Sequence, residues 1–434
     1  MIEPTPPQAA TPLPWDAPVP DPVAALARAR DDLGDTFAVT APDTEYLFLF
    51  SPAGVRAFYA LDERVASKGL ADWRMLVRKL PDEVFAGRRT LPHRFFGRAE
   101  VDDYLHVLAR VVDAVIEEMG DWGTIEIFAF TRAIGHRLGL GSWAGPETLT
   151  HPELPALIDA LDTLDPSAAF VRPEEMAAVA ADDKAIERAA MATVERILGD
   201  TVRSRLGSSV GDDLLGRIID QWRDEPPVEA AVGVARDVIL LHLGSMSNLF
   251  AAMGWTIVDL LAHADARRRL LAGEDPGWAE QCALESTRLA QRSIMLREVL
   301  RPVTVDDGTT TWRLSPGATV ATLLPLTNRS AGPGLDRYHP DRWSGRRLVD
   351  PADLATRELV TVFGHGPHTC PAQPFSLSAM TMVTTRLFTD FELHADYESA
   401  GPRPGQIGGV ARAAAPCPVA YRVHPDTTVT AADW

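Results

Sequence analysis

The chain has 434 residues, of which 46% are hydrophobic and 24% charged, a balance typical of a folded globular protein rather than a disordered one. Its 60 Asp and Glu residues outnumber its 42 Lys and Arg residues, and the formal charge of −18 makes nucleic acid a poor partner. The three cysteines are too few and too widely separated for a disulfide framework or a zinc site.

The first 22 residues are rich in proline, which predicts an extended N-terminal arm along the surface. They contain no basic segment followed by an apolar one, so a secretory signal is not supported. The sequence contains no run of about 18 apolar residues, the length that would predict a membrane span. We therefore expect a cytoplasmic protein, without a membrane partner, whose residues 23–434 form one domain.

Residues 46–50 predict a strand and residues 52–61 a helix, within an N-terminal β-containing lobe of about residues 23–70. A helix-rich lobe should follow, with helices over residues 101–119, 185–198, 213–223, 229–263 and 276–295. Residues 302–366 are divided by Pro and Gly into strands and loops, and another helix should begin just after Cys370. Short strands are expected at residues 391–394 and 419–423.

The helix over residues 229–263 is largely apolar, because no charged residue lies between Asp237 and Asp259. A helix that is apolar on all sides over this length belongs in the centre of a large core. Simple core packing would explain the pattern without any catalytic role.

Residues 363–372 read Phe-Gly-His-Gly-Pro-His-Thr-Cys-Pro-Ala. Gly364 and Gly366 allow a tight turn, which places Cys370 at the start of the following helix, where backbone N–H groups favour a thiolate. A buried structural cysteine is the ordinary alternative for a single thiol. The spacing of the loop, however, resembles the haem-binding loop of the cytochrome P450 superfamily.

This resemblance implies the P450 fold, a triangular, mainly α domain with small β-sheets that encloses haem b (iron protoporphyrin IX). Cys370 matches the axial ligand of the iron, Phe363 the aromatic residue beside the sulfur, and His368 the basic residue near a haem propionate. Gly364 belongs to the same cofactor-binding loop. Ala372 occupies a position where glycine is commoner in the family.

Glu285 and Arg288 share one helix face and can form an ion pair, which by itself would usually be a solvated surface pair. Beside the Cys370 loop they resemble the family's Glu-x-x-Arg element, which Arg342 would complete as a structural triad. The resemblance also implies that Arg297 binds a haem propionate. A basic cluster (Arg88, Arg89, His93, Arg94 and Arg98) would bind the other propionate or a redox partner, or would be ordinary surface charge.

The central helix departs from the common family pattern, in which an acidic residue precedes a threonine above the iron. Alignment on Trp255 places Ser247 at the acid position and Asn248 at the threonine position. Asn248 and the Arg-Glu-Val at residues 297–299 resemble the branch with prostacyclin synthase and the sterol 7α-hydroxylases. Ser247 and Asn248 are the candidate catalytic residues, although Asn248 could equally satisfy a carbonyl inside the helix.

Three functions remain open. The first is a monooxygenase that hydroxylates a small apolar or aromatic metabolite in secondary metabolism, with electrons from a separate ferredoxin and its reductase. The second is an isomerase, dehydratase or group-transfer enzyme that cleaves an O–O or N–O bond already present in its substrate and needs no redox partner. The third is a haem sensor without turnover. We expect substrate contacts from residues 167–171, the central helix and Met295.

Overall fold

The computed structural model describes residues 5–90, 95–96, 101–167, 172–345, 347–348 and 354–424. The helices of these segments are α1 (Pro22–Leu33), α2 (Pro52–Ala60), α3 (Lys68–Leu76), α4 (Val101–Met119), α5 (Ile127–Trp143), α6 (Leu154–Leu164), α7 (Pro173–Ala181), α8 (Ala185–Gly207), α9 (Leu214–Asp220), α10 (Pro227–Ala262), α11 (Ala264–Ala272), α12 (Trp278–Ala290), α13 (Leu324–Ser330) and α14 (Gln373–Asp390). The strands are β1 (Thr36–Thr40), β2 (Glu45–Leu49), β3 (Ala66–Ser67), β4 (Trp122–Glu126), β5 (Ile294–Val299), β6 (Val303–Asp306), β7 (Thr311–Leu314), β8 (Thr319–Leu323), β9 (Trp343–Ser344), β10 (Arg347–Leu348), β11 (Phe391–Ala395) and β12 (Pro418–Val423).

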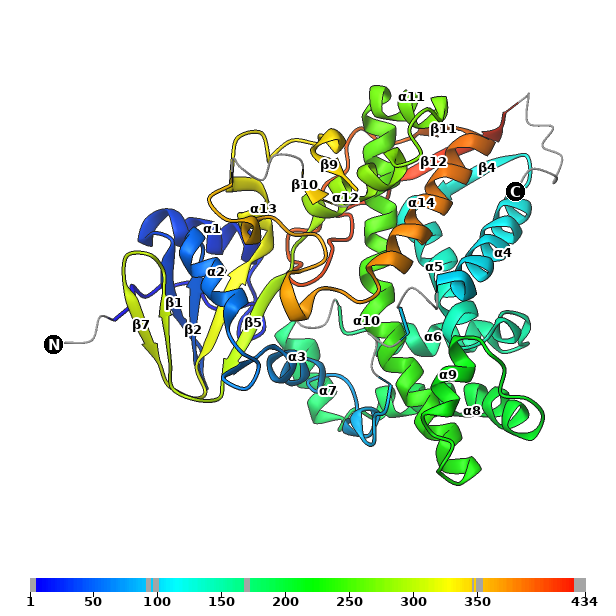
Figure 1. Cartoon of the computed structure of the whole chain (residues 1–434), viewed down its shortest axis with the longest axis horizontal. Helices are drawn as coiled ribbons and strands as arrows, with labels where there is room; N and C mark the ends of the chain where they lie inside the picture. Colours follow the sequence, from blue (N-terminus) through cyan, green and yellow to red (C-terminus); the bar gives the residue numbers. More distant parts are fainter. Residues whose placement is uncertain are drawn as a thin grey trace.

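The largest sheet has the strand order β1-β2-β8-β5-β3 and forms one end of the molecule, beside the N-terminus (Figure 1). Strands β1 and β2 form an antiparallel hairpin, whereas β8 pairs with β2 in parallel. Because β5 and β8 come from much later in the chain, the lobe expected over residues 23–70 also takes in residues 294–323. No local sequence pattern specifies such a long-range pairing.

The N-terminal arm is tied to the edge of this sheet. Ala38 donates its N–H to the Pro7 carbonyl, and its own carbonyl accepts the Ala9 N–H, both at 2.8 Å. Leu13 and Trp15 are buried, and they pack in one cluster with side chains of β1 and β2. The arm therefore contributes apolar side chains to the core of the sheet lobe.

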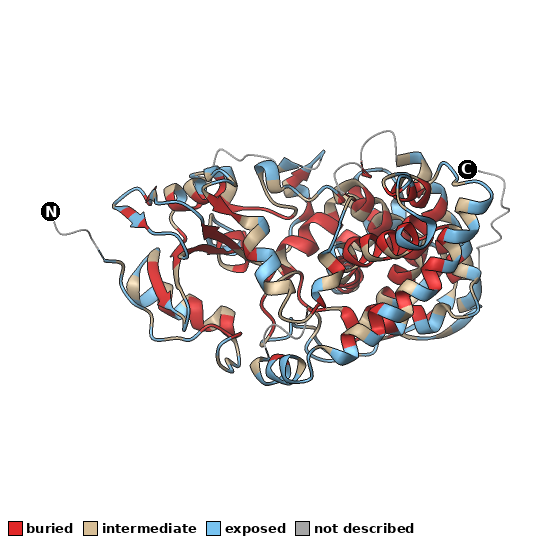
Figure 2. Ribbon diagram, turned by 90° about the horizontal axis from the view of Figure 1, so that it is seen from below, coloured by how far each residue is buried: buried red, intermediate tan, exposed pale blue. Residues whose placement is uncertain are grey.

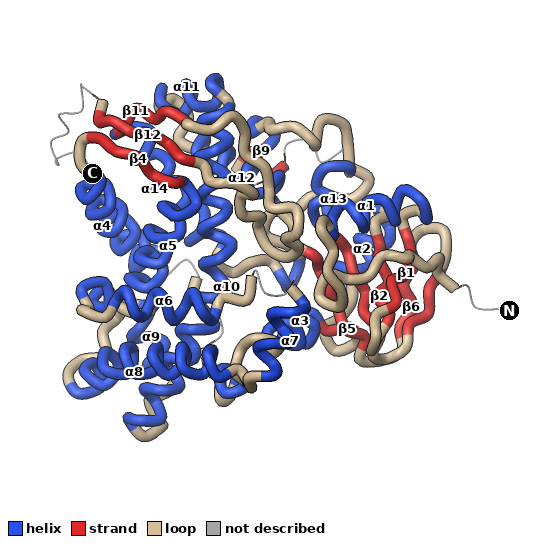
Figure 3. The backbone as a smooth tube through the Cα atoms, turned by 180° about the vertical axis from the view of Figure 1, so that it is seen from behind, coloured by secondary structure: helices blue, strands red, loops and turns tan. Residues whose placement is uncertain are grey.

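Helix α10 runs through the helix-rich lobe, with α5, α8, α12 and α14 packed against it (Figures 1 and 3). It is long and apolar enough to cross a membrane by length and composition alone, but most of that stretch is buried inside the protein. Helices on several sides satisfy its apolar surface, as Figure 2 shows by the concentration of buried residues in this lobe. The observed helix begins two residues before the range predicted from the sequence and ends one residue earlier.

Asp237 is the buried acid of α10, and it holds the segment before α4 and the turn after α9. Its carboxylate accepts hydrogen bonds from the Thr90 hydroxyl at 2.7 Å and from Trp222 Nε1 at 2.8 Å. A buried carboxylate needs such donors to offset its lost hydration.

Two expected helix boundaries are wrong. The helix expected over residues 276–295 ends at Ala290, because residues 294–299 pair with β8 as strand β5. The helix expected over residues 185–198 continues to Gly207. Helix α5 follows the short strand β4 and was not expected from the sequence. Its buried face contains several glycines, so large apolar residues do not recur along it at regular helical spacing.

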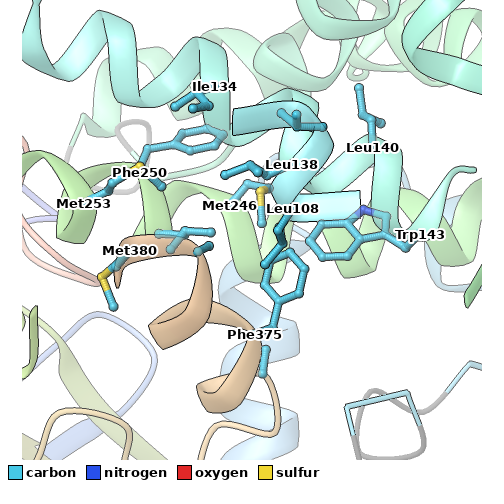
Figure 4. Close-up of a cluster of buried hydrophobic side chains, with 14 of the residues drawn as sticks. Leu108, Ile134, Leu138, Leu140, Trp143, Met246, Phe250, Met253, Phe375 and Met380 are labelled. Carbon is cyan, nitrogen blue, oxygen red and sulfur yellow. The ribbon is translucent and has the colours of Figure 1, made fainter. Parts of the chain in front are cut away.

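Those glycines let α5 and α10 approach closely. Figure 4 shows Phe250 and Met253 of α10 facing Ile134 and Leu138 of α5, with Met380 and Phe375 of α14 on another side. A Cβ added at Gly135 would lie 2.3 Å from two ring carbons of Phe250.

We therefore expect Gly135→Ala to lower the free energy of unfolding by about 1–3 kcal/mol, because the Phe250 ring must leave its packed position. The measurement is the midpoint of denaturant unfolding. Gly207→Ala is the matched control, since nothing lies within 4 Å of a Cβ added at the end of α8. Equal midpoints for the two variants would contradict the close packing of α5 on α10.

Candidate functional site

A cavity of about 250 Å³ lies between α10 and the loop that carries Cys370. Gly244, Ser245 and Asn248 of α10 line one side, and Phe363, Gly364, His368 and Cys370 line the loop side. Thr287 of α12 and Met295 of β5 complete the wall between them. Met295, expected from the sequence among the substrate contacts, therefore borders this cavity.

The Cys370 loop folds back on itself through its own backbone. The Cys370 N–H donates to the Phe363 carbonyl at 2.7 Å, and the Gly364 N–H donates to the Thr361 hydroxyl at 2.8 Å. Gly364 has φ +81°, and a Cβ added there would lie 2.9 Å from the His368 carbonyl oxygen. Glycine is required at this position by conformation and by space. Helix α14 begins at Gln373, as expected from the sequence.

Cys370 is the cysteine of the cavity, since Cys282 and Cys417 are buried away from its lining. Burial raises the pKa of the Cys370 thiol, although the Ala372 backbone N–H opposes that shift. The helix start therefore does not by itself make the thiol a thiolate, whereas coordination to a metal ion would remove its proton. Across the described segments no group of three or more His, Cys, Asp or Glu could hold a metal ion.

Arg297 and His368, expected on a propionate, lie together around a third residue that the sequence did not single out. The Glu63 carboxylate lies 3.0 Å from His368 Nε2 and 3.6 Å from Arg297 Nη1. Burial lowers the pKa of the His368 imidazole, and the nearby Arg297 charge lowers it further. The turn before β3 brings Glu63 to this place. Its partners Arg297 and His368 lie far along the chain, so the pattern of residues 60–70 alone could not indicate them.

Arg297 is buried and donates through Nη1 to the Leu61 and Ala66 carbonyls, both at 2.9 Å. Its Nε is also buried and has no hydrogen-bond acceptor among the described residues. A buried guanidinium N–H without an acceptor is costly, and a carboxylate would satisfy it. Arg297 does not itself line the cavity, but it lies beside His368, which does, and the two residues fit a cofactor that bears carboxylates.

Glu285, Arg288 and Arg342 come together as a buried network. Both side chains of the Glu285–Arg288 pair have 0% exposure, and the Arg288 Nη2 lies 2.8 Å from Glu285 Oε1. Arg342 Nε lies 2.8 Å from the same oxygen, and Trp343 Nε1 donates to the other at 3.0 Å. Burial alone would raise the pKa of Glu285, but its bonds to Arg288 and the charge of Arg342 outweigh burial and lower it.

On the opposite wall, Asn248 lines the cavity and Ser247 does not. The Asn248 Oδ1 accepts the Val410 N–H at 2.9 Å, which leaves the amide NH2 group as its available donor. Ser247 instead lies 3.4 Å from Arg412 Nη2, on another face of the helix. No Asp or Glu lines this cavity within the described part of the chain.

A buried pair of histidines, one from α10 and one from α5, was not expected from the sequence. His242 Nε2 lies 3.0 Å from His136 Nδ1, and His136 Nε2 lies 2.8 Å from the Asp162 carboxylate. Burial lowers the pKa of His242 well below its usual range, so this imidazole is neutral. A lone histidine in an apolar helix needs a partner. The pair therefore joins α10 to α5 and, through Asp162, to α6.

The basic cluster is only partly described. Arg89 stacks on Trp222 with its guanidinium 4.6 Å from the ring centre and pairs with Glu225, so it binds the turn after α9. Arg88 donates to the Thr90 carbonyl at 3.1 Å. His93, Arg94 and Arg98 lie outside the described residues, as do residues 168–171 of the expected substrate contacts.

No family model matches the chain. It is similar to cytochrome P450 141 of Mycobacterium tuberculosis, with 31% identity over 183 residues that cover 42% of this chain and 41% of that protein. It is 26% identical to the cytochrome P450 monooxygenase sphH of Aspergillus fumigatus, over 36% of this chain and 33% of that protein. Human 24-hydroxycholesterol 7-alpha-hydroxylase is 23% identical over 42% of each chain.

The chain thus spans less than half the length of the curated relatives it matches. Its helix-rich architecture with small sheets is the cytochrome P450 fold, which confirms the fold predicted from the sequence. The cofactor implied by these relatives is haem b.

The buried Glu285 network leads to a prediction about stability and pH. The folded-state pKa of Glu285 is lowered, so its stabilisation is complete above the unfolded pKa of about 4.3 and is lost as pH falls through the folded pKa. Glu285→Gln should lower the free energy of unfolding at neutral pH by about 3–5 kcal/mol, because Arg288 stays buried without its counter-charge. The loss of stability on acidification should become shallower than in the wild type.

Denaturant unfolding between pH 3 and pH 7, a range set by that pKa of roughly 4.3, measures both effects. Glu392→Gln is the control, since Glu392 pairs with Arg422 on the exposed edge of β11 and its loss should leave stability unchanged. If Glu285→Gln matched this control, the network would not be structural.

Proposed function

We propose that this chain is a haem-thiolate monooxygenase that hydroxylates or otherwise oxidises a small, mainly apolar or aromatic metabolite, in secondary metabolism. The observation that carries the proposal is one cavity with Cys370 and Phe363 on one wall and Asn248 of α10 on the opposite wall. Haem, when bound, supplies an iron whose thiolate ligand donates electron density and favours cleavage of an O–O bond. The names of the matched relatives support this activity.

In this proposal each wall has a separate role. Cys370 would hold the haem iron through its sulfur, and the Phe363 carbonyl accepts the Cys370 backbone N–H, which fixes the turn that carries this residue. Arg297 and His368 would bind the propionates, for which the unsatisfied Arg297 Nε offers a donor. The Asn248 amide, oriented by the Val410 N–H, donates to the oxygen of the bound reactant.

The electron source is a separate ferredoxin with its reductase, driven by NAD(P)H. The names of the matched relatives as cytochrome P450 proteins support a redox partner of this kind. The protein acts in the cytoplasm, without a nucleic-acid or membrane partner.

A second candidate function is cleavage of an O–O or N–O bond in an already activated substrate, as an isomerase, dehydratase or cyclising transferase. It is favoured by the lack of a carboxylate among the described residues that line the cavity. The resemblance of Asn248 to the prostacyclin synthase and sterol 7α-hydroxylase branch is compatible with either reaction.

Two assays on the same preparation separate these functions. Monooxygenation requires NADPH, ferredoxin, reductase and oxygen, and product should vanish when any one is omitted. The alternative predicts that ferric protein under argon converts a hydroperoxide or oxime substrate without reductant. Turnover under argon would overturn the monooxygenase proposal, and turnover in neither assay would overturn both.

Asn248 provides a prediction about the distal wall. Asn248→Asp keeps an acceptor for the Val410 N–H but removes the amide donor, whereas Asn248→Leu removes both. We expect Asn248→Asp to retain the melting temperature of the wild type and to lose at least about fivefold in kcat, since a lost hydrogen bond to a reacting oxygen costs about 1 kcal/mol or more. Asn248→Leu should also lower the melting temperature. If Asn248→Asp turned over at the wild-type rate, Asn248 would be structural only.

A further inference from the structure

A second pocket, of about 220 Å³, lies between the N-terminal arm, the segment before α7 and the loop that joins β11 to β12. Three arginines line it, namely Arg172 before α7 and Arg403 and Arg412 of the loop. Such a gathering of cations is notable in a chain with a formal charge of −18. We refer to these three residues and their cavity as the arginine pocket.

The arginine pocket has one positive charge in excess. Arg172 pairs with Glu175 in a half-exposed ion pair, and Arg412 Nη2 lies 2.7 Å from the Asp165 carboxylate. Arg403 has no carboxylate or hydrogen-bond partner among the described residues for its guanidinium. Arg403 is exposed at the mouth of the pocket, and partial desolvation together with the charges of Arg412 and Arg172 lowers its pKa. Asp165 also lies 3.9 Å from Arg132, so the three guanidinium groups of the pocket carry at least one positive charge that no described carboxylate offsets.

Arg412 also keeps donors available. Its bonds to Asp165, to the Ser167 hydroxyl at 2.8 Å and to the Ser247 hydroxyl at 3.4 Å all come from Nη2. Its Nε and Nη1 have no acceptor within the described segments. A guanidinium group whose position is fixed through one nitrogen, while its other nitrogens have no acceptor, can donate those hydrogen bonds to an anion.

The same loop connects the arginine pocket to the cavity of Cys370. Val410 lines that cavity and donates its N–H to Asn248, while Arg412, two residues later, lines the arginine pocket. Between them the Ala411 carbonyl accepts a hydrogen bond from Trp255 Nε1 at 2.6 Å. Three successive residues are thus attached to α10, and this short segment lines both cavities, Val410 the one and Arg412 the other.

We propose that the arginine pocket binds the carboxylate of an otherwise apolar substrate, whose other end reaches the cavity beside Cys370. This inference rests on the proposed function and names its substrate class. A planar carboxylate matches the two open donors of Arg412, Nε and Nη1, in bidentate geometry. Ser247, placed by the sequence at the position of a catalytic acid, then positions Arg412 instead of transferring a proton.

The test uses the full chain with its haem and begins with the measured haem content of the preparation. Saturated carboxylic acids of increasing length and their matched primary amides are titrated into the ferric protein, and binding is followed by the absorbance of the haem iron. We expect each acid that binds to do so at least about tenfold more tightly than its amide.

Arg403→Gln should reduce this acid-over-amide ratio by about tenfold, and Arg403→Lys should retain part of it. Arg422→Gln is the matched control, since Arg422 is an exposed arginine of β12 that pairs with Glu392. Its ratio should equal that of the wild type, and the haem content of all three variants should be unchanged.

Haem-loaded protein that binds acids and amides equally, or binds neither, would overturn the carboxylate inference and leave the proposed function standing. An acid preference that persists in Arg403→Gln would do the same. A chain that incorporates no haem would overturn the proposed function, and the substrate inference with it.

Discussion

The buried ion pair of Glu285 and Arg288 positions the loop on which the whole site depends. Arg288 Nη1 donates to the Asn328 carbonyl at 2.6 Å, and the Asn328 amide exchanges two hydrogen bonds with the Thr361 backbone. The Thr361 hydroxyl then accepts the Gly364 N–H at 2.8 Å. A continuous series of buried hydrogen bonds thus runs from α12 to the Cys370 loop. Because each member is desolvated, loss of one partner leaves its neighbour unsatisfied, which holds the loop in a single conformation.

The two walls of the cavity are built on different principles. The Cys370 wall is a tight turn that is held by its own backbone hydrogen bonds and by the network of Glu285 and Arg288. Such a turn can keep a metal-binding side chain in one position. The opposite wall is α10, where Asn248 is bonded to the loop after β11 through Val410. Ser247 lies outside the cavity and is bonded to the same loop through Arg412. In the proposed function, substrate binding and the orientation of Asn248 are therefore coupled through one loop. The same loop pairs with residues 290–292, and Gln291 donates to the Val362 carbonyl beside Phe363 at 3.1 Å.

Much of this organisation could be predicted from the sequence because it is encoded locally. The Cys370 loop, the Glu285 and Arg288 spacing and the apolar α10 are continuous patterns, and the structure brings Cys370, Phe363 and His368 to one cavity. Glu63, between Arg297 and His368, could not be found in this way, because its role arises only when β3 pairs with β5.

Other features missed by the sequence have a similar physical cause. Ser247 lies on the predicted central helix but outside the cavity lining, and its contact with Arg412 could not be predicted, since Arg412 lies far along the chain. His242 carried a signal, as a lone polar residue in an apolar helix, but its partner on α5 could not be named without the fold. Long-range partners of charged and polar groups are the part that local periodicity leaves undetermined.

The central claim is that Cys370 is the axial thiolate of a haem iron. The most direct measurement is the carbon monoxide difference spectrum of the reduced protein. The account predicts an absorbance maximum at the position typical of thiolate-ligated haem in the wild type and in a Cys282→Ser, Cys417→Ser double variant, and its loss in Cys370→Ala. A maximum near that of histidine-ligated haems in the wild type would contradict the assignment.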